Sequence, residues 1–552
     1  MRPVVEEIAG LVDKMRDDLQ AAGQQQVANL LEASKALEAA SRPEAAKQVQ
    51  AGRRRRAVPR SFFREGLTAG EMRRNILTLA WPSVASLALQ TLVGMVTMMT
   101  VGSLGPAALA AVGLGNLVIF IMIGVLTAFS VGTTALVARG IGAGHQERAE
   151  NALRQSLVAG VAVATSLSLT VYFSAETLVR LLMVSNHDET VINMAGVYLR
   201  YVSLSMIVGV LLIIINGALE GAGDTRTPLY TMIVVNLINV AGAVTLVPGL
   251  GPFPELGLEG AAWAAAAARV VGAALAVAWA VSPYSVVRLR FKERWRLDWS
   301  TIRQVLDIGL PSAGEQLVRQ AAMVIYTVFI ASMGTLAMAA HQITGNVNSL
   351  SMLPGMGFAV AATTLVGQSL GAGHPEVASR YATETNKMGT LLMVSIAALF
   401  GIFTRPFVSL YTADPGVVGL AVQTVRIVAV ASIPFSVVII TSGSLRGAGD
   451  TRFVLYATAI GQWGIRLILT FGLAWGLGLG LNGVWLAMLL DVSIRALLML
   501  WRFRSGVWKT VFSLQEARYF GHAEVEDLVE NGRQHRAGEK PEGKPVASGL
   551  CQ

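Results

Sequence analysis

Charged side chains are scarce inside the long apolar stretches of this sequence, and two acid–arginine pairs stand out there. Glu315 lies four residues before Arg319, and Asp491 lies four residues before Arg495. On a helix this spacing places both partners on one face. A carboxylate among apolar residues can take up a proton or bind a cation such as Na⁺. We therefore predict that Glu315, assisted by Arg319, binds an ion, with Asp491 as the next candidate. A static ion pair is the alternative for both and the better explanation of Asp491–Arg495.

Polar and sulfur-containing side chains in the same stretches could line a binding cavity. Gln316 and Gln342 could contact a ligand, and His341 could titrate near neutral pH, although a lone His in a Gly/Ala-rich helix is more often a packed, hydrogen-bonded residue. Met98 and Met356 belong to a group of methionines whose flexible thioethers suit a cavity that accepts many shapes. Packing against lipid or core is the commoner role of any single Met.

Other kinds of chemistry lack support. The one cysteine, Cys551, allows no intrachain disulfide, and no His/Cys cluster has the spacing of metal ligands. A glycine-rich motif at 221–226 could suggest a phosphate loop, but no strand precedes it and no Lys-Ser/Thr follows the glycines. We expect no catalytic residue, no metal and no cofactor other than a coupling ion.

The elements that must position these residues are apolar runs long enough to cross a membrane. Hydrophobic residues make up 53 % of the chain and charged residues 14 %, whereas soluble domains carry about 25 % charge. A helix needs roughly 20 apolar residues to span a bilayer, and only helices satisfy their own backbone there. We count twelve apolar runs as spans, six per repeat, and most of them reach this length: 75–101, 107–138, 152–173, 191–215, 229–247, 261–284, 308–332, 336–365, 389–404, 417–440, 453–475 and 484–501.

The chain repeats itself. Gly-Ala-Gly-Asp-Thr-Arg at 221–226 recurs at 447–452, and Gly-Ala-Gly-His at 142–145 recurs at 371–374. The fold class we predict is an all-α polytopic membrane protein with two parallel repeats of six transmembrane helices. Duplicated bundles of this kind are typical of transporters with a central site.

Basic residues indicate the orientation and the domain boundaries. Five of them lie between Arg288 and Arg296, whereas loops 248–260 and 477–483 contain no Lys or Arg. The positive-inside rule therefore predicts an inner-membrane protein with both termini in the cytoplasm. We predict an N-terminal extension at 1–72, with an amphipathic helix and a polybasic segment, and a disordered tail at 509–552. Between them lie two lobes, 73–286 and 302–508, joined by a basic linker at 287–301. The net charge of +9 fits anionic lipid rather than nucleic acid, and we expect a monomer.

Several segments, in the same order in both repeats, resemble the multidrug and toxic compound extrusion (MATE) family. They are 102–115, 142–144, 221–228, 339–342 (Ala-Ala-His-Gln), 445–451 and 485–502. The resemblance implies two six-helix lobes that form a V around a central cavity. It also implies export of amphipathic, often cationic compounds in exchange for H⁺ or Na⁺.

The chain departs from the family pattern where many members carry acids. Thr97 occupies such a position in the first span, Ala243 follows Asn239 by four residues in the fifth, and Phe435 stands in the tenth. The resemblance therefore implies that the second lobe carries the ion exchange, while Thr97 and Asn239 remain candidates for the substrate cavity. Two alternatives stay open: a flippase of the same superfamily for a lipid-linked precursor, which should have a more cationic cavity, and a non-transporting receptor or scaffold.

Overall fold

A computed structural model of the chain describes residues 66–183, 188–250, 254–290 and 296–515. The predicted amphipathic helix, the polybasic segment, part of the basic linker and the tail after Gln515 lie outside these ranges. Residues 507–515, at the start of the predicted tail, are helical.

The described part of the chain is all helical, which confirms the predicted class. The first repeat contains α3 (Ala69–Gly102), α4 (Pro106–Gly142), α5 (Gln146–Leu182), α6 (Glu189–Gly221), α7 (Arg226–Leu246) and α8 (Gly257–Val281). The second contains α9 (Trp299–Ala331), α10 (Thr335–Gly371), α11 (Pro375–Ile402), the short α12 (Thr404–Ser409), α13 (Pro415–Gly447) and α16 (Gly480–Arg504). Between α13 and α16 runs one broken helix, composed of α14 (Thr451–Ala459), the π-helical η2 (Ile460–Arg466), α15 (Leu467–Phe471) and the π-helical η3 (Gly472–Gly476).

Eleven helical stretches in the described ranges are long and apolar enough to cross a membrane. The long helix outside that group is α9, which carries Glu315 and Arg319 near its middle. Several helices are longer than the apolar runs predicted for them, and α11 begins 14 residues before the run at 389–404. The reason is that an α-helix continues through polar turns beyond the apolar part until a cap ends it.

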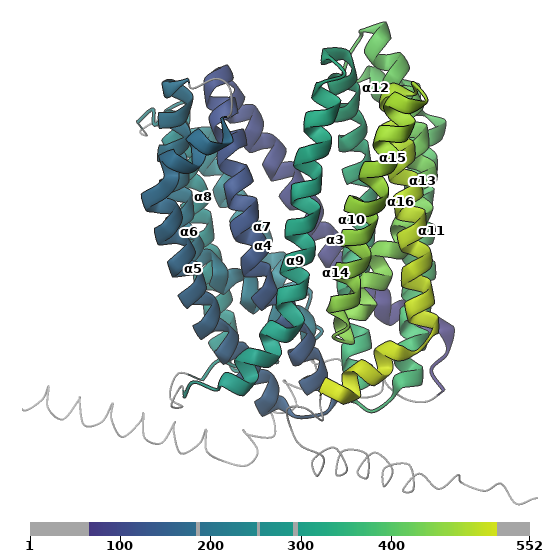
Figure 1. Cartoon of the computed structure of the whole chain (residues 1–552). Helices are drawn as coiled ribbons and strands as arrows, with labels where there is room; N and C mark the ends of the chain where they lie inside the picture. Colours follow the sequence, from purple (N-terminus) through teal and green to yellow (C-terminus); the bar gives the residue numbers. More distant parts are fainter. Residues whose placement is uncertain (1–65, 184–187, 251–253, 291–295, 516–552) are drawn as a thin grey trace, which may run out of the picture. The chain divides into compact units, whose positions relative to one another are not determined.

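Two helices pass between the lobes. In the first lobe α6 packs against α4, α5 and α8, and in the second α13 packs against α10, α11 and α16. The first helix of each repeat contacts both lobes: α3 packs against α7 of the first lobe and α10 of the second, and α9 packs against α4 of the first lobe and α14 of the second. Figure 1 shows the two groups of helices close together at one end and spread apart at the other.

The lobes meet where α4 and α10 end, and we call this region the sealed end. A Cβ atom at Gly142 would collide with the carbonyl of Gln368, and one at Gly371 with the carbonyl of Arg139, so the two backbones touch. Gln368 Nε2 donates to the Gly221 carbonyl at 2.8 Å. Only glycine permits such close approach of two backbones.

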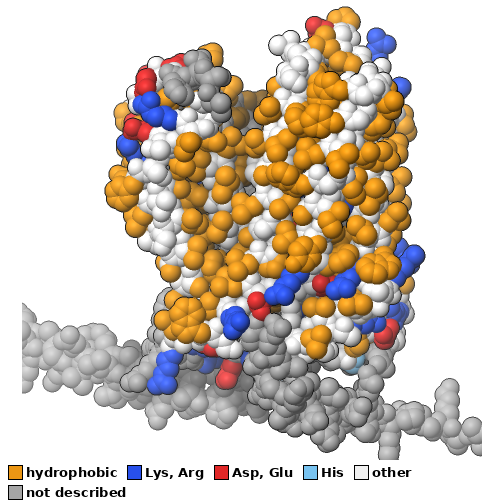
Figure 2. Space-filling view, in the orientation of Figure 1, with side chains coloured by type: hydrophobic (Ala, Val, Ile, Leu, Met, Phe, Trp, Pro, Cys, Tyr) orange, Lys and Arg blue, Asp and Glu red, His pale blue; other side chains and the backbone are white. Residues whose placement is uncertain are grey.

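Side-chain bonds add to this contact. Thr364 Oγ1 of α10 donates to the Glu220 carbonyl of α6 at 2.8 Å. Gln515 accepts from both terminal nitrogens of Arg139 at 3.1 Å and donates to the Gly449 carbonyl at 3.3 Å, so it links the two lobes. At the opposite end the lobes are separated by a hollow, while hydrophobic side chains cover most of the visible face (Figure 2).

Candidate functional site

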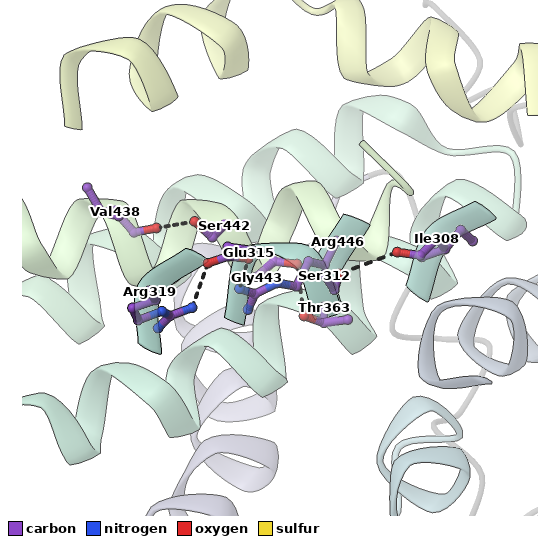
Figure 3. A network of polar contacts seen from close by, with 9 residues as sticks. All are labelled: Ile308, Ser312, Glu315, Arg319, Thr363, Val438, Ser442, Gly443 and Arg446. Atoms are coloured by element: carbon purple, nitrogen blue, oxygen red, sulfur yellow. Dashed lines mark hydrogen bonds and ion pairs between the residues drawn. The ribbon is translucent and has the colours of Figure 1, made fainter. Parts of the chain in front are cut away.

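Glu315 lies on α9 one turn after Pro311, and its carboxylate bridges two arginines (Figure 3). Oε1 accepts from Arg319 Nη2 at 2.7 Å, and Oε2 accepts from Arg446 Nη2 at 2.7 Å. The Glu315 side chain is only 7 % exposed, whereas Arg319 is 43 % and Arg446 24 % exposed. One buried carboxylate is thus held between two guanidinium groups that remain partly accessible.

Arg446 is a member of this cluster that our sequence analysis missed. It belongs to α13, 131 residues from Glu315, and no local spacing connects the two. A signal was present in the repeat, because Leu445-Arg446-Gly447 corresponds to Leu219-Glu220-Gly221. A position in the last turn of an apolar helix that is acidic in one repeat and basic in the other is a candidate for a functional charge.

Asp491 and Arg495 form a separate pair on α16. Arg495 Nε and Nη2 donate to the two Asp491 oxygens, both at 2.8 Å, and both side chains are almost fully buried. Gly461 of η2 leaves the space for them, since a Cβ atom there would collide with Asp491. Because both oxygens are engaged and inaccessible, this geometry favours the static-pair interpretation.

His341 faces an aromatic side chain rather than an acid. Its ring lies 5.3 Å from that of Trp485, and its Nδ1 is buried with no hydrogen-bond partner among the described residues. Nearby on the same lobe, Arg466 stacks over the Tyr326 ring at 4.1 Å. Gln342 is exposed on α10.

The remaining cavity candidates are divided between the lobes. Thr97 of α3 and Asn239 of α7 lie at the outer limit of a hydrogen bond, 3.5 Å apart. Gln316 is exposed on α9 and borders Gly124 of α4. Met98 and Met356 are exposed by 38 % and 43 %. The structure therefore joins Glu315, Arg319 and Arg446 and leaves Thr97–Asn239 and His341 as separate positions.

No group of three or more His, Cys, Asp or Glu side chains within the described ranges could hold a metal ion. The chemistry open to the Glu315 cluster is reversible: a proton or a small cation at the carboxylate would replace one or both guanidinium groups.

Comparison with known proteins identifies one family and relatives that match most of the chain. The MatE family profile matches residues 82–245 and 311–471. The chain is 30 % identical to the probable multidrug resistance protein NorM of Thermotoga maritima over 440 residues, which cover 80 % of this chain and 94 % of that protein. It is 27 % identical to the uncharacterized transporter YisQ of Bacillus subtilis, with coverage of 79 % and 94 %.

Solved structures have the same twelve-helix fold. A MATE structure in the bent conformation superposes with a TM-score of 0.72 at 22 % identity, covering 84 % of this chain and 98 % of that one. An outward-facing multidrug resistance MATE transporter of the MOP superfamily also gives 0.72 at 22 % identity, with coverage of 83 % and 97 %. A MOP superfamily transporter from Pyrococcus furiosus, described as having a binding pocket of reverse polarity, gives 0.73 at 23 % identity, with coverage of 79 % and 95 %.

Proposed function

The chain belongs to the MATE family of membrane transporters, and on that basis we propose that it is a secondary active multidrug efflux transporter. Its substrates in this proposal are amphipathic, often cationic compounds, which it exports in exchange for H⁺ or Na⁺. Relatives named as multidrug resistance proteins support this substrate class. The relatives are named as transporters rather than enzymes, in keeping with the lack of catalytic motifs.

One observation carries the proposal: the lobes are joined by close backbone contacts at the sealed end and separated by a hollow at the other. This is the geometry of one state of alternating access, in which two repeats rock about a central site. We assign the sealed end to the cytoplasm, in an inner membrane, because the positive-inside rule predicts cytoplasmic termini. A monomer suffices for this mechanism.

Glu315 is our candidate for the ion-binding group. When a proton or Na⁺ occupies its carboxylate, the attraction to Arg319 on α9 and to Arg446 on α13 weakens. Since the Glu315–Arg446 contact links α9 to α13, ion binding would change the packing of α9 against the second lobe. That change couples the ion to the movement of a helix that also packs on the first lobe.

The test is transport in proteoliposomes with imposed pH and Na⁺ gradients and a fluorescent cation such as ethidium as substrate. Efflux should collapse with an uncoupler or on removal of Na⁺. Efflux that persists on ATP alone, with neither gradient present, would refute the antiporter proposal.

The second candidate function is that of a flippase for a lipid-linked precursor. The observation that favours it is the excess positive charge of the Glu315 cluster, where two arginines share one carboxylate. Such a site suits a pyrophosphate group. Two phenotypes separate the functions. Broad drug resistance when the protein is expressed in an efflux-deficient host favours efflux, and a defect of the cell envelope when its gene is deleted favours the flippase.

A further inference from the structure

A groove of 810 Å³ lies between α11, α13 and α16, on the second lobe. Small-molecule sites have roughly 300–1,000 Å³, so the groove can hold a ligand. None of the candidate site residues described above lines it. One end of the groove lies near the start of α11 and the end of α16, and this is the sealed end of the molecule.

The lining changes character along the groove. Ser379 and Thr383 lie near the start of α11, and Val394 lies about 22 Å from Ser379 along the helix axis at 1.5 Å per residue. Farther from the sealed end the wall is apolar, formed by Leu391, Val394, Val437 and Leu500, and Leu391 is 71 % exposed. The groove therefore has a polar mouth and an apolar extension that runs in the direction of the membrane-spanning helices.

Three cations stand at the polar mouth: Lys387, Arg504 and Lys509, with no acid in the lining. Arg504 is exposed and forms no ion pair with another described residue. Lys387 reaches Glu384 at 2.8 Å and Lys509 reaches Glu376 at 2.7 Å, both outside the groove lining. Each pair has one partner open to solvent, since Lys387 is 65 % and Glu376 is 82 % exposed. Pairs in contact with solvent contribute little, so an anion in the groove can compete for both lysines.

The floor of the groove is fixed by bonds between helices. Asn386 Nδ2 donates to Thr441 Oγ1 at 2.6 Å, and Ser436 Oγ donates to Thr390 Oγ1 at 2.9 Å. These bonds tie α11 to α13 and leave the cations at the mouth available. The site is consequently formed before any ligand binds.

We propose that this groove binds one anionic phospholipid from the leaflet at the sealed end. The phosphate lies among Lys387, Arg504 and Lys509, and an acyl chain lies along Leu391, Val394 and Leu500. Basic pockets between transmembrane helices bind anionic headgroups in this way. The apolar extension favours a lipid over free phosphate. Three cations line the mouth and only two of them pair with an acid, so the mouth has a net positive charge and favours an anionic headgroup over a zwitterionic one.

The experiment uses the full chain in nanodiscs with equal amounts of phosphatidylglycerol and phosphatidylcholine, followed by transfer to mild detergent and native mass spectrometry. Wild type should retain phosphatidylglycerol over phosphatidylcholine at least fivefold. The triple variant Lys387→Gln/Arg504→Gln/Lys509→Gln should bring this ratio close to one. Val394→Trp, which keeps the cations and fills the apolar extension, should reduce the retained phosphatidylglycerol at least threefold. Arg226→Gln, an exposed arginine at the start of α7 in the other lobe, is the matched control and should match wild type.

Three outcomes would overturn the proposal. They are equal retention of the two lipids by wild type, unchanged retention in either groove variant, and displacement of the lipid by glycerol phosphate, which has the headgroup chemistry without tails. Size-exclusion profiles establish that each variant is folded. Transport is not the readout, so the result stands apart from the proposed efflux function.

Discussion

The carboxylate of Glu315 is shared by two guanidinium groups, one from its own helix and one from α13. A charge inside a membrane-spanning helix is costly. Arg446 lies in the last turn of α13, and mutual pairing of the three side chains offsets the cost of burying the Glu315 carboxylate. The cluster has one more positive than negative charge, and its arginines are partly exposed while its acid is buried. In the mechanism that we propose, an ion that reaches the acid has to displace an arginine, which would make ion binding and helix position interdependent.

Replacement of Glu315 by Gln tests this at the residue scale. Gln keeps the side-chain volume but removes the charge, so we expect gradient-driven efflux in proteoliposomes to fall at least tenfold. The matched control is Glu176→Gln, which breaks a 2.8 Å pair with Arg200 in the first lobe. Glu176→Gln and Thr97→Ala should each leave the efflux rate close to that of wild type. Efflux at the wild-type rate in Glu315→Gln would make Glu315 a structural partner of its arginines, with Asp491 next to be tested.

Asp298 allows a prediction about pH, since it lies outside the helices and caps α9. Burial raises its pKa, but hydrogen bonds from the Thr301 hydroxyl and backbone, the Asn151 amide and the Ser300 backbone outweigh burial and hold the pKa below its ordinary value. A carboxyl group whose pKa is lowered by folding stabilises the protein above the unfolded pKa, about 4. That stabilisation is lost as the pH falls through the folded value.

Asp298→Ala should therefore lower the free energy of unfolding by about 1 kcal/mol at pH 7. The difference in the free energy of unfolding between Asp298→Ala and wild type should stay constant down to about pH 5 and narrow below about pH 4. Denaturant titrations followed by circular dichroism measure it. Asp298→Asn, which can still cap the helix, should retain most of the stability at pH 7. A difference as large at pH 3 as at pH 7 would contradict the assignment.

At the scale of elements, glycines decide how closely the two lobes can approach. Gly142 of α4 faces the backbone of α10, and Gly371 of α10 faces the backbone of α4, so equivalent positions in the two repeats make reciprocal contacts. Added atoms in such a packed crossing typically cost 1–3 kcal/mol. The same motif that marks the duplication in the sequence thus forms the seal.

Gly142→Ala should shift the protein away from the sealed state. With Cys551 replaced by Ser, a cysteine introduced at buried Thr364 should react with maleimide about tenfold faster when Gly142→Ala is present, since 1.4 kcal/mol corresponds to tenfold. Gly113→Ala on the same helix is the control, because a Cβ atom there meets nothing within 4 Å. Equal acceleration by both variants would show that the crossing at Gly142 does not hold the seal.

At the scale of the whole molecule, we predict that the sealed end faces the cytoplasm and the opposite end faces the outside of the cell. Leu250 and Leu479 are exposed by 53 % and 41 % and lie in loops that follow α7 and η3, at the end opposite the seal. Cysteines at these positions should react in intact cells with a membrane-impermeant maleimide, and native Cys551, outside the described ranges, should not. Reaction of Cys551 in sealed cells would reverse the predicted topology.

Much of the fold could be predicted because it depends on local properties of the chain. Apolar length predicts a membrane helix, and the Gly-Ala-Gly motifs predict the duplication. The all-α class, the family and the two-lobe fold predicted in this way are confirmed. The run at 308–332 was predicted as a span despite its charges, and α9 occupies it. The start of α11 was not anticipated, because polar helical turns beyond the membrane do not differ in composition from loops.

The sequence by itself determined which residues share a helix face, and hence the Glu315–Arg319 contact, since a spacing of four residues is a property of one helix. Only the tertiary structure decided that Arg446 completes the cluster, that Thr97 and Asn239 stand apart from His341, and that Gly142 meets Gln368. These contacts depend on the rotation and axial position of each helix against its neighbours. Those are set by the packing of small and large side chains from segments more than 100 residues apart, and no local pattern records them.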